Sequence, residues 1–238
     1  IFKHYKQYEN NAFNACCCRP WRASIGANVG QRGLSRRYVR ITMIADGAAR
    51  LEYAPDGKFV DNKSQVAVIR DYAPVSYKVS DKSKTVRIST DAMTITYVKG
   101  KGPFTSANLS IVSAKKKGAL PFSWKPGQKD DGNLKGTYRT LDGYDGDLRN
   151  GKPMPIEDGV LSKSGWTLIN DSKSYLFDRS EWPWVEERPD TTKAQDWYFL
   201  AYGHDYKKAL RMFTKFSGKV PLPPRYAFGY WWSRYWSY

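Results

Sequence analysis

The sequence predicts a mainly β protein organised as an antiparallel β-sandwich. Short segments in which apolar and polar residues alternate recur about every ten residues, and turn-forming residues separate them. These segments lie at residues 39–43, 49–53, 66–69, 77–79, 86–88, 93–97 and 109–111. Only one segment has a clear helical period, so helix is expected to be a minor part of the fold.

Turn residues between neighbouring segments define the expected hairpins. Asp46-Gly47 lies between the first two alternating segments, and Asp-Gly suits a two-residue hairpin turn. A further hairpin is expected between residues 166–169 and 174–177, across the turn-forming residues 170–173. Residues 196–202 are expected to form a strand of their own.

The one helix is expected directly after Asp205, because aspartate caps helix N-termini. Apolar residues then recur at helical spacing and form one stripe, which predicts an amphipathic helix. They are Tyr206, Ala209, Leu210, Phe213 and Phe216. Gly218 is expected to end the helix, since glycine is the preferred residue just beyond a helix C-terminus.

The composition is that of a globular protein with a large positive charge. Of 238 residues, 41% are hydrophobic, and 39 Lys and Arg against 23 Asp and Glu leave a formal charge of +16. This charge suggests a basic nucleic-acid-binding domain as one alternative. However, the basic residues are scattered and no nucleic-acid motif is present, so we expect a solvated surface and no nucleic-acid partner. No apolar run approaches the roughly 20 residues of a membrane span.

Residues 1–37 show no clear period and are expected to form a poorly structured or atypical leader. The chain's three cysteines are the adjacent Cys16, Cys17 and Cys18. They lack the Cys and His spacing of a zinc site, and their odd number argues against a disulfide framework. We therefore expect neither a metal nor any other cofactor.

Residues 219–238 combine a proline-rich linker with an aromatic run. Prolines at 221, 223 and 224 exclude helix and inner sheet from the linker. The run that follows contains Trp231, Trp232 and Trp236, and aromatic residues favour strands. It is either the last core strand of one complete domain or the beginning of a second domain. We favour the second interpretation.

Several segments resemble glycoside hydrolase family 31, the family of α-glucosidases and α-xylosidases. They are Gly-Thr-Tyr-Arg-Thr-Leu-Asp-Gly at 136–143, Gly-Val-Leu-Ser-Lys-Ser-Gly-Trp at 159–166, Gly-His-Asp-Tyr-Lys-Lys-Ala-Leu at 203–210, the proline linker, and Gly-Tyr-Trp-Trp-Ser-Arg-Tyr-Trp at 229–236. The resemblance extends back to about Tyr38 and is specific in order and spacing. Lys163 stands where family members often have Arg, which puts a bidentate contact there in doubt.

The resemblance implies a galactose-mutarotase-like β-sandwich at residues 38–202, a connecting helix and linker at 203–224, and the first strand of a truncated (β/α)8 barrel at 225–238. By the same resemblance, residues 227–233 would be that strand. It also implies retaining hydrolysis of α-linked glucosides or xylosides by two aspartates on later barrel strands. These strands would lie beyond Tyr238, so this chain alone is expected to be inactive.

What the chain is expected to supply is part of a sugar pocket. By position in the resemblance, Asp158, Trp232, Arg234 and Tyr235 would line it, and the partners would be an oligosaccharide and the missing barrel. Other carboxylates, at Asp142, Asp145, Asp147 and Glu157, are interpreted first as turn formers. His204 is expected to be structural.

Two further expectations concern the setting of the chain. A periplasmic or secreted location is favoured over a cytoplasmic one for a polysaccharide-degrading enzyme. The alternative to a glycosidase fragment is a stand-alone carbohydrate-binding sandwich, because the chain is rich in aromatic residues, which suit both sugar binding and large cores.

Overall fold

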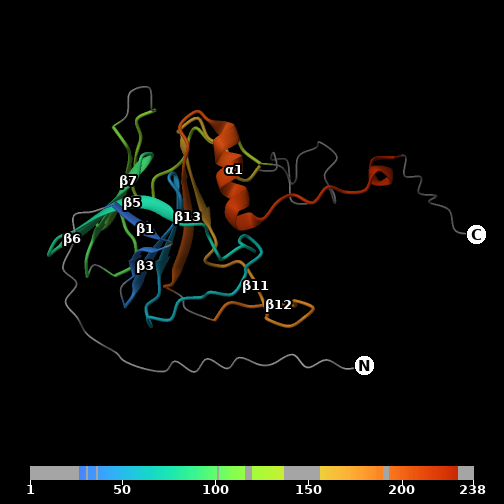
Figure 1. Cartoon of the computed structure of the whole chain (residues 1–238), viewed down its shortest axis with the longest axis horizontal. Helices are drawn as coiled ribbons and strands as arrows, with labels where there is room; N and C mark the ends of the chain where they lie inside the picture. Colours follow the sequence, from blue (N-terminus) through green and yellow to red (C-terminus); the bar gives the residue numbers. More distant parts are fainter. Residues whose placement is uncertain are drawn as a thin grey trace, which may run out of the picture.

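The computed structural model describes residues 27–30, 32–35, 37–100, 102–115, 120–136, 156–189 and 193–229. Within these ranges the chain forms two antiparallel sheets that face each other, as expected from the sequence (Figure 1). The six-stranded sheet has the spatial order β1 (Ala27–Gly30), β5 (Val75–Asp81), β6 (Thr85–Ser89), β7 (Met93–Val98), β8 (Leu109–Ser113), β9 (Ser123–Trp124). The five-stranded sheet has the order β10 (Trp166–Asn170), β13 (Gln195–Ala201), β4 (Ala48–Tyr53), β3 (Val39–Ala45), β2 (Arg32–Ser35).

Both sheets take a strand from residues 27–35, ahead of the point where the alternating pattern begins. Strand β1 pairs with β5, and β2 pairs with β3 across a register shift. Strand β1 is therefore an edge strand of the six-stranded sheet, and β2 is an edge strand of the five-stranded sheet.

The hairpins are mostly those that the turn residues predict. Strands β3 and β4 pair around Asp46-Gly47, and β5 to β8 form a meander. The hairpin expected between residues 166–169 and 174–177 is wrong. Strand β10 pairs with β13, whereas β11 (Leu176–Phe177) pairs with β12 (Val185–Glu186). The segment 66–69 contains no strand.

The core lies between the sheets and is built from alternate residues of each strand. Along β5 to β8 most outward positions are polar and the inward ones apolar, because only one face of that sheet is covered. Val98 and Val112 are the apolar exceptions among the outward positions. Trp124, Trp166 and Phe199 meet at one end of this core, with Trp124 and Phe199 ring centroids 4.9 Å apart. Burial of such large rings supplies much of the hydrophobic stabilisation.

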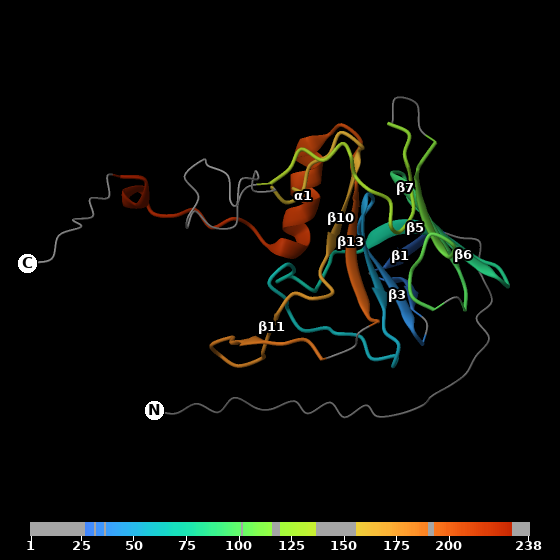
Figure 2. The ribbon, with the colours of Figure 1, turned by 180° about the vertical axis from the view of Figure 1, so that it is seen from behind.

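The five-stranded sheet is covered on its outer face as well, which explains why β13 is buried along most of its length. Helix α1 (Tyr206–Ser217) covers one half of that face, and Figure 2 shows it beside β10 and β13, on the side opposite β5 and β7. Phe216 stacks on Tyr198 with ring centroids 4.2 Å apart. The other half of the face carries charged side chains, described below.

The helix begins and ends as predicted. The Asp205 side chain accepts a hydrogen bond from Lys208 N at 2.8 Å, and Gly218 ends the helix with φ +84°. Its buried stripe differs in one position, because Met212 is buried and Leu210 is 47% exposed. No helix in the described part of the chain is long and apolar enough to cross a membrane.

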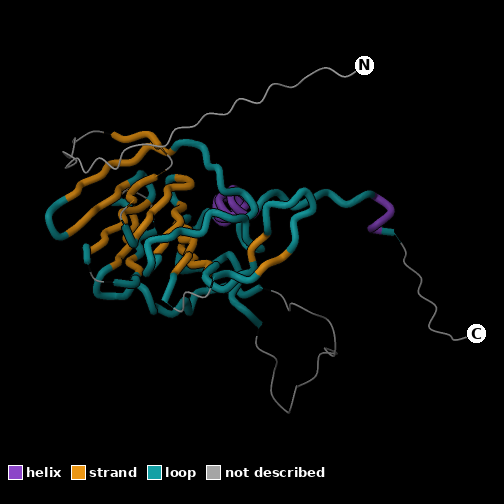
Figure 3. The backbone as a smooth tube through the Cα atoms, turned by 90° about the horizontal axis from the view of Figure 1, so that it is seen from below, coloured by secondary structure: helices purple, strands orange, loops and turns teal. Residues whose placement is uncertain are grey.

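Beyond the helix the linker is exposed and leads into a short 3-10 helix, η1 (Arg225–Phe228). Figure 3 shows η1 standing apart from the sandwich. The strand expected at residues 227–233 thus starts, within the described residues, as part of η1. Residues 230–238 lie outside them.

Candidate functional site

Asp158 lies in a loop that is tied to a second segment of the sandwich. Residues 132–136 run beside residues 157–163 and exchange backbone hydrogen bonds with them. Leu134 N donates to Leu161 O at 2.9 Å, Lys163 N to Gly132 O at 2.8 Å, and Gly136 N to Glu157 O at 2.8 Å. The loop thus has a strand-like partner on one side, which fixes its path.

Two polar side chains, Asn133 and Asp130, hold the two segments together. Asn133 donates through Nδ2 to Gly159 O at 3.0 Å and accepts through Oδ1 from Gly159 N at 2.9 Å. Asp130 Oδ1 accepts from the hydroxyls of Ser162 and Ser164, at 2.7 and 2.8 Å. Because these bonds satisfy both backbone groups of Gly159, they hold the residue next to Asp158.

Glycines allow the backbones at this junction to approach closely. A Cβ on Gly159 would lie 2.4 Å from Lys135 O, and one on Gly132 would lie 2.6 Å from Ser164 Oγ. Gly165 has φ +77°, and a Cβ there would lie 3.0 Å from Gly203 Cα. Larger residues would force the segments apart.

The start of the connecting segment meets the same loop. Tyr202 N and Gly203 N both donate to Gly165 O, at 3.0 and 2.9 Å. The buried Tyr202 hydroxyl accepts from Ser162 N at 2.7 Å, and burial raises the pKa of this phenol. Residues 159–166 and 203–210, two of the segments that resemble family 31, are therefore in direct contact.

Asp158 itself faces solvent. Its side chain is 60% exposed and forms an ion pair with Lys135, with Nζ 2.5 Å from Oδ1. It lines an open cavity of about 700 Å³ together with Asp130, Asn133 and residues of β10 and α1. The Asp158 carboxylate can accept hydrogen bonds from the hydroxyls of a sugar, and the Lys135 ammonium can donate to them.

The other expected site residues cannot be placed beside it. Trp232, Arg234 and Tyr235 lie outside the described residues, as do Asp142, Asp145 and Asp147. His204 is exposed just before α1, with its ring 6.4 Å from that of Tyr206. Among the described residues, no group of three or more His, Cys, Asp or Glu side chains could hold a metal ion.

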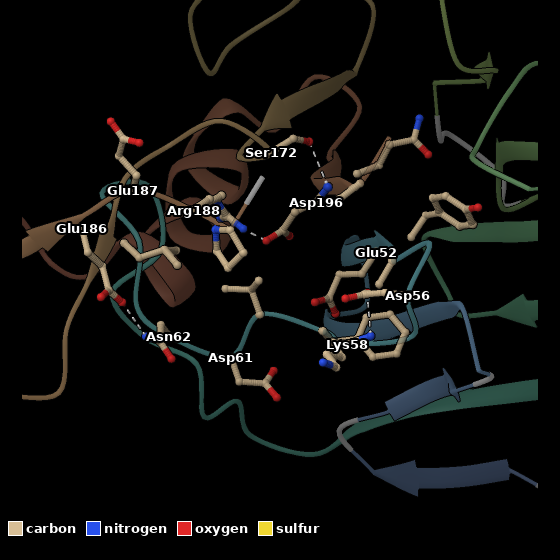
Figure 4. Close-up of a pocket in the computed structure, with 18 of the residues that line it drawn as sticks. Glu52, Asp56, Lys58, Asp61, Asn62, Ser172, Glu186, Glu187, Arg188 and Asp196 are labelled. Carbon is tan, nitrogen blue, oxygen red and sulfur yellow. Dashed lines mark hydrogen bonds and ion pairs between the residues drawn. The ribbon is translucent and has the colours of Figure 1, made fainter. Parts of the chain in front are cut away.

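A second polar feature, which the sequence pattern did not predict, is an ionic network on the outer face of the five-stranded sheet. Four arginines meet four carboxylates there, and one wall of an adjoining cavity of about 420 Å³ is built from this network (Figure 4). Its members are Arg40, Arg50, Arg70, Arg188, Glu52, Asp61, Asp171 and Asp196.

The central contacts of the network are bidentate. Arg40 binds Glu52 through Nε and Nη2, at 2.6 and 2.7 Å, and its Nη2 also binds Asp61. Arg50 binds Asp196 through Nε and Nη2, at 2.8 and 2.7 Å. Burial raises the pKa of Asp171, whereas at Asp196 the nearby arginines, led by Arg50, outweigh burial and lower the pKa. The network is a structural element. It joins β3, β4 and β13 to Asp61, Asp171 and Arg188, which lie in the segments that cover this face of the sheet.

Comparisons with known proteins give a partial likeness. No family model and no curated protein matches the chain. A GH31 dextranase of Flavobacterium johnsoniae complexed with glucose has a TM-score of 0.49 and 17% identity, over 87% of this chain and 29% of the dextranase. A mutant of the same enzyme complexed with isomaltotriose gives the same values. A GH31 α-xylosidase of Xanthomonas citri has a TM-score of 0.26 and 18% identity, over 71% of this chain and 14% of that one.

Proposed function

We propose that this chain is the N-terminal part of a retaining glycoside hydrolase of the family 31 type, which acts on α-linked glucosides or xylosides in carbohydrate metabolism. The observation that supports this most is the contact between residues 159–166 and 203–210. These two segments, which resemble the family in sequence, are separated along the chain and hydrogen-bond to each other through Gly165, Tyr202 and Gly203. Export fits an enzyme whose substrate is a polysaccharide too large to be taken up intact.

In this proposal the sandwich supplies pocket wall and the barrel supplies the catalytic aspartates. Asn133 fixes the loop of Asp158 through its hydrogen bonds to Gly159, so the backbone position of Asp158 is defined. The Asp158 carboxylate is accessible from solvent. Trp232, Arg234 and Tyr235 would complete the wall from the end of the first barrel strand, since barrel sites form at the C-terminal ends of strands.

The buried carboxylates of the described residues are Glu52, Asp171 and Asp196, and arginines hold all three. The half-buried Asp130 binds Ser162, Ser164 and Asn133. None of these arrangements suits catalysis. A retaining glycosidase needs one carboxylate free to attack and a second that carries a proton. We therefore propose that the 238-residue chain takes part in hydrolysis only as part of the larger enzyme.

The test is glycosidase activity of the full-length protein on nitrophenyl α-glucoside and α-xyloside, with product anomers followed by NMR. We expect retention of configuration, and no activity from the 238-residue chain alone. In the full-length enzyme, Asp158→Ala should lower kcat/KM about tenfold, the loss of about one charged hydrogen bond. Asp131→Ala is the matched control, because Asp131 is an exposed carboxylate in the neighbouring segment.

The possible outcomes separate the parts of the proposal. Full-length protein inactive on every α-glycoside would contradict the family assignment. Activity of the 238-residue chain alone would overturn the division of roles between sandwich and barrel. An Asp158→Ala enzyme with unchanged kcat/KM would remove Asp158 from the pocket and leave the family assignment in place.

A further inference from the structure

Two tryptophans are almost fully exposed in the loop that joins β11 and β12. Trp182 is 86% exposed and Trp184 77% exposed. Indoles contribute to stability when they are buried, so neither side chain gains much from the fold in this position. Single exposed apolar residues are ordinary, but two exposed indoles two residues apart suggest an interaction surface.

Hydrogen bonds hold the loop in one conformation. Asp178 Oδ1 accepts from Ser180 N at 3.2 Å, from the Ser180 hydroxyl at 2.7 Å and from Trp184 N at 2.9 Å. These bonds lower the pKa of Asp178, so the ionised form that accepts them is favoured. Because the loop is already ordered, a ligand that stacks on the indoles costs little additional conformational entropy.

The hairpin is also fixed to the sandwich. Asn62 donates through Nδ2 to Glu186 Oε1 at 3.0 Å and accepts through Oδ1 from Arg179 Nη2 at 3.2 Å. Ser64 forms a β-bridge with Leu176 at the base of the hairpin. The indoles are thus presented from a fixed support.

The residues that flank the loop line the cavity of about 420 Å³ seen in Figure 4. This volume is within the usual range of about 300 to 1,000 Å³ for small-molecule sites. Glu186, Glu187 and Arg188 line it from the hairpin and its end, and Lys58 and Asn62 from the segment of residues 56–62. These side chains offer both hydrogen-bond donors and acceptors, as vicinal hydroxyl groups require.

The charge of the lining argues against an anionic ligand. Six carboxylates (Glu52, Asp56, Asp61, Glu186, Glu187, Asp196) line the cavity against three cationic side chains (Lys58, Arg179, Arg188). Arg40 and Arg50 bind Glu52, Asp61 and Asp196, so the cavity is close to neutral overall. In a chain of net charge +16 its lining therefore has no excess of cations that would select a phosphate. A neutral, hydroxyl-rich ligand suits both the polar lining and the exposed indoles of the loop whose flanking residues line the cavity.

We propose that the β11–β12 hairpin and this cavity form a binding site for a neutral oligosaccharide, with the faces of sugar rings stacked on Trp182 and Trp184. This site is separate from the proposed pocket wall, because the cavity lined by Asp158 shares no residue with it. It would hold a polysaccharide chain away from the site of hydrolysis. Failure of this proposal would leave the proposed glycosidase function untouched.

The test measures binding by the 238-residue chain. Affinity electrophoresis in gels with dextran, soluble starch or xyloglucan is combined with tryptophan fluorescence titrations using maltotriose and isomaltotriose. We expect retardation by at least one neutral glycan, and a loss of affinity of about tenfold for Trp182→Ala and for Trp184→Ala. Tyr226→Ala is the control, because Tyr226 is 73% exposed on η1, away from the hairpin.

Folding is not expected to complicate the test, because exposed indoles leave no cavity on truncation; melting temperatures of the variants should match the parent. Absence of binding to all of these glycans would overturn the proposal, as would equal binding by the parent and both variants. If the indoles instead contact a second copy, sedimentation would show a dimer that the Trp182→Ala, Trp184→Ala double variant loses, without any change in glycan binding. Salt-sensitive binding of heparin alone would equally contradict a neutral ligand.

Discussion

Arg50 and Asp196 are 146 positions apart in the sequence, and their side chains form a bidentate ion pair on the outer face of the five-stranded sheet. Arg50 also lies 3.1 Å from Glu52, and Arg188 lies 3.2 Å from Asp196. Both members of the pair are less than a tenth exposed, so each charge depends on its partners for solvation. The pair links β4 to the neighbouring strand β13 through side chains as well as through the backbone.

Removal of the Asp196 charge should destabilise the protein and change its pH dependence. Asp196→Asn leaves Arg50 buried without its main partner, a loss of about 3 kcal/mol in the free energy of unfolding at neutral pH. The arginines hold the pKa of Asp196 below its ordinary value of 3.8, so its contribution is present above that pH and is lost as the pH falls through the lower, folded-state value.

Urea unfolding between about pH 6 and about pH 2 tests this expectation. The parent should lose stability toward acid more steeply than Asp196→Asn, and the two curves should converge at the acid end. An Asp131→Asn variant, in which the exposed pair with Lys129 is altered, should follow the parent curve. Parallel curves for parent and Asp196→Asn would show that another group is responsible.

The alternating pattern correctly predicted which residues of β3 to β8 face the core. It did not predict that charged residues on the opposite face of β3 and β4 are buried. Arg40, Arg50 and Glu52 alternate with apolar residues, a pattern that ordinarily places charges in solvent. Here they are buried because residues 56–62 and the segment around Arg188 cover them, and Asp196, which binds Arg50, lies 146 positions away in sequence. No local pattern encodes such partners.

The incorrect hairpin has the same origin. Residues 170–173 have the composition of a turn, but Asp171 is fully buried, binds Ser64 and Arg188, and donates its N–H to Asp196 O. These long-range contacts carry the chain past β10 instead of back onto it. By contrast, the beginning and end of α1 follow from the two residues that flank it, Asp205 and Gly218, and they were predicted correctly.

Gly165 should tolerate alanine less well than a glycine of similar backbone conformation elsewhere. Both Gly165 (φ +77°) and Gly127 (φ +86°) are strained for any other residue, at a cost of about 1–2 kcal/mol. A Cβ on Gly127 meets nothing within 4 Å, whereas one on Gly165 lies 2.6 Å from Leu120 Cδ2 and 3.0 Å from Gly203 Cα.

Thermal unfolding of Gly165→Ala and Gly127→Ala separates the clash from the backbone strain. We expect Gly165→Ala to lose about 1–3 kcal/mol more than Gly127→Ala, which lowers its melting temperature by several degrees more. Under the proposed function, Gly165→Ala should also lower the glycosidase activity of the full-length protein, since the loop of Asp158 depends on this contact. Equal losses of stability for the two variants would mean that the segments around Gly165 can move apart without a further loss in the free energy of unfolding.

Phe216 should be the most costly residue of α1 to truncate. Its ring is fully buried, stacks on Tyr198 at 4.2 Å and meets Phe213 edge-on at 5.3 Å. Phe216→Ala leaves a cavity between helix and sheet and should cost about 3–5 kcal/mol. Leu210→Ala removes a large apolar side chain from the exposed side of the same helix and should change stability by less than about 0.5 kcal/mol.

Hydrogen exchange shows whether α1 is held to the sheet by this contact. In Phe216→Ala the amides of α1 should lose protection before those of β3 and β4, because the helix depends on tertiary packing more than on its own propensity. Leu210→Ala should leave the order of exchange unchanged. If both variants lost the same stability, α1 would be anchored by its ends, through Asp205 and the Ile69 N–H bond to Phe216 O, and not by the apolar stripe.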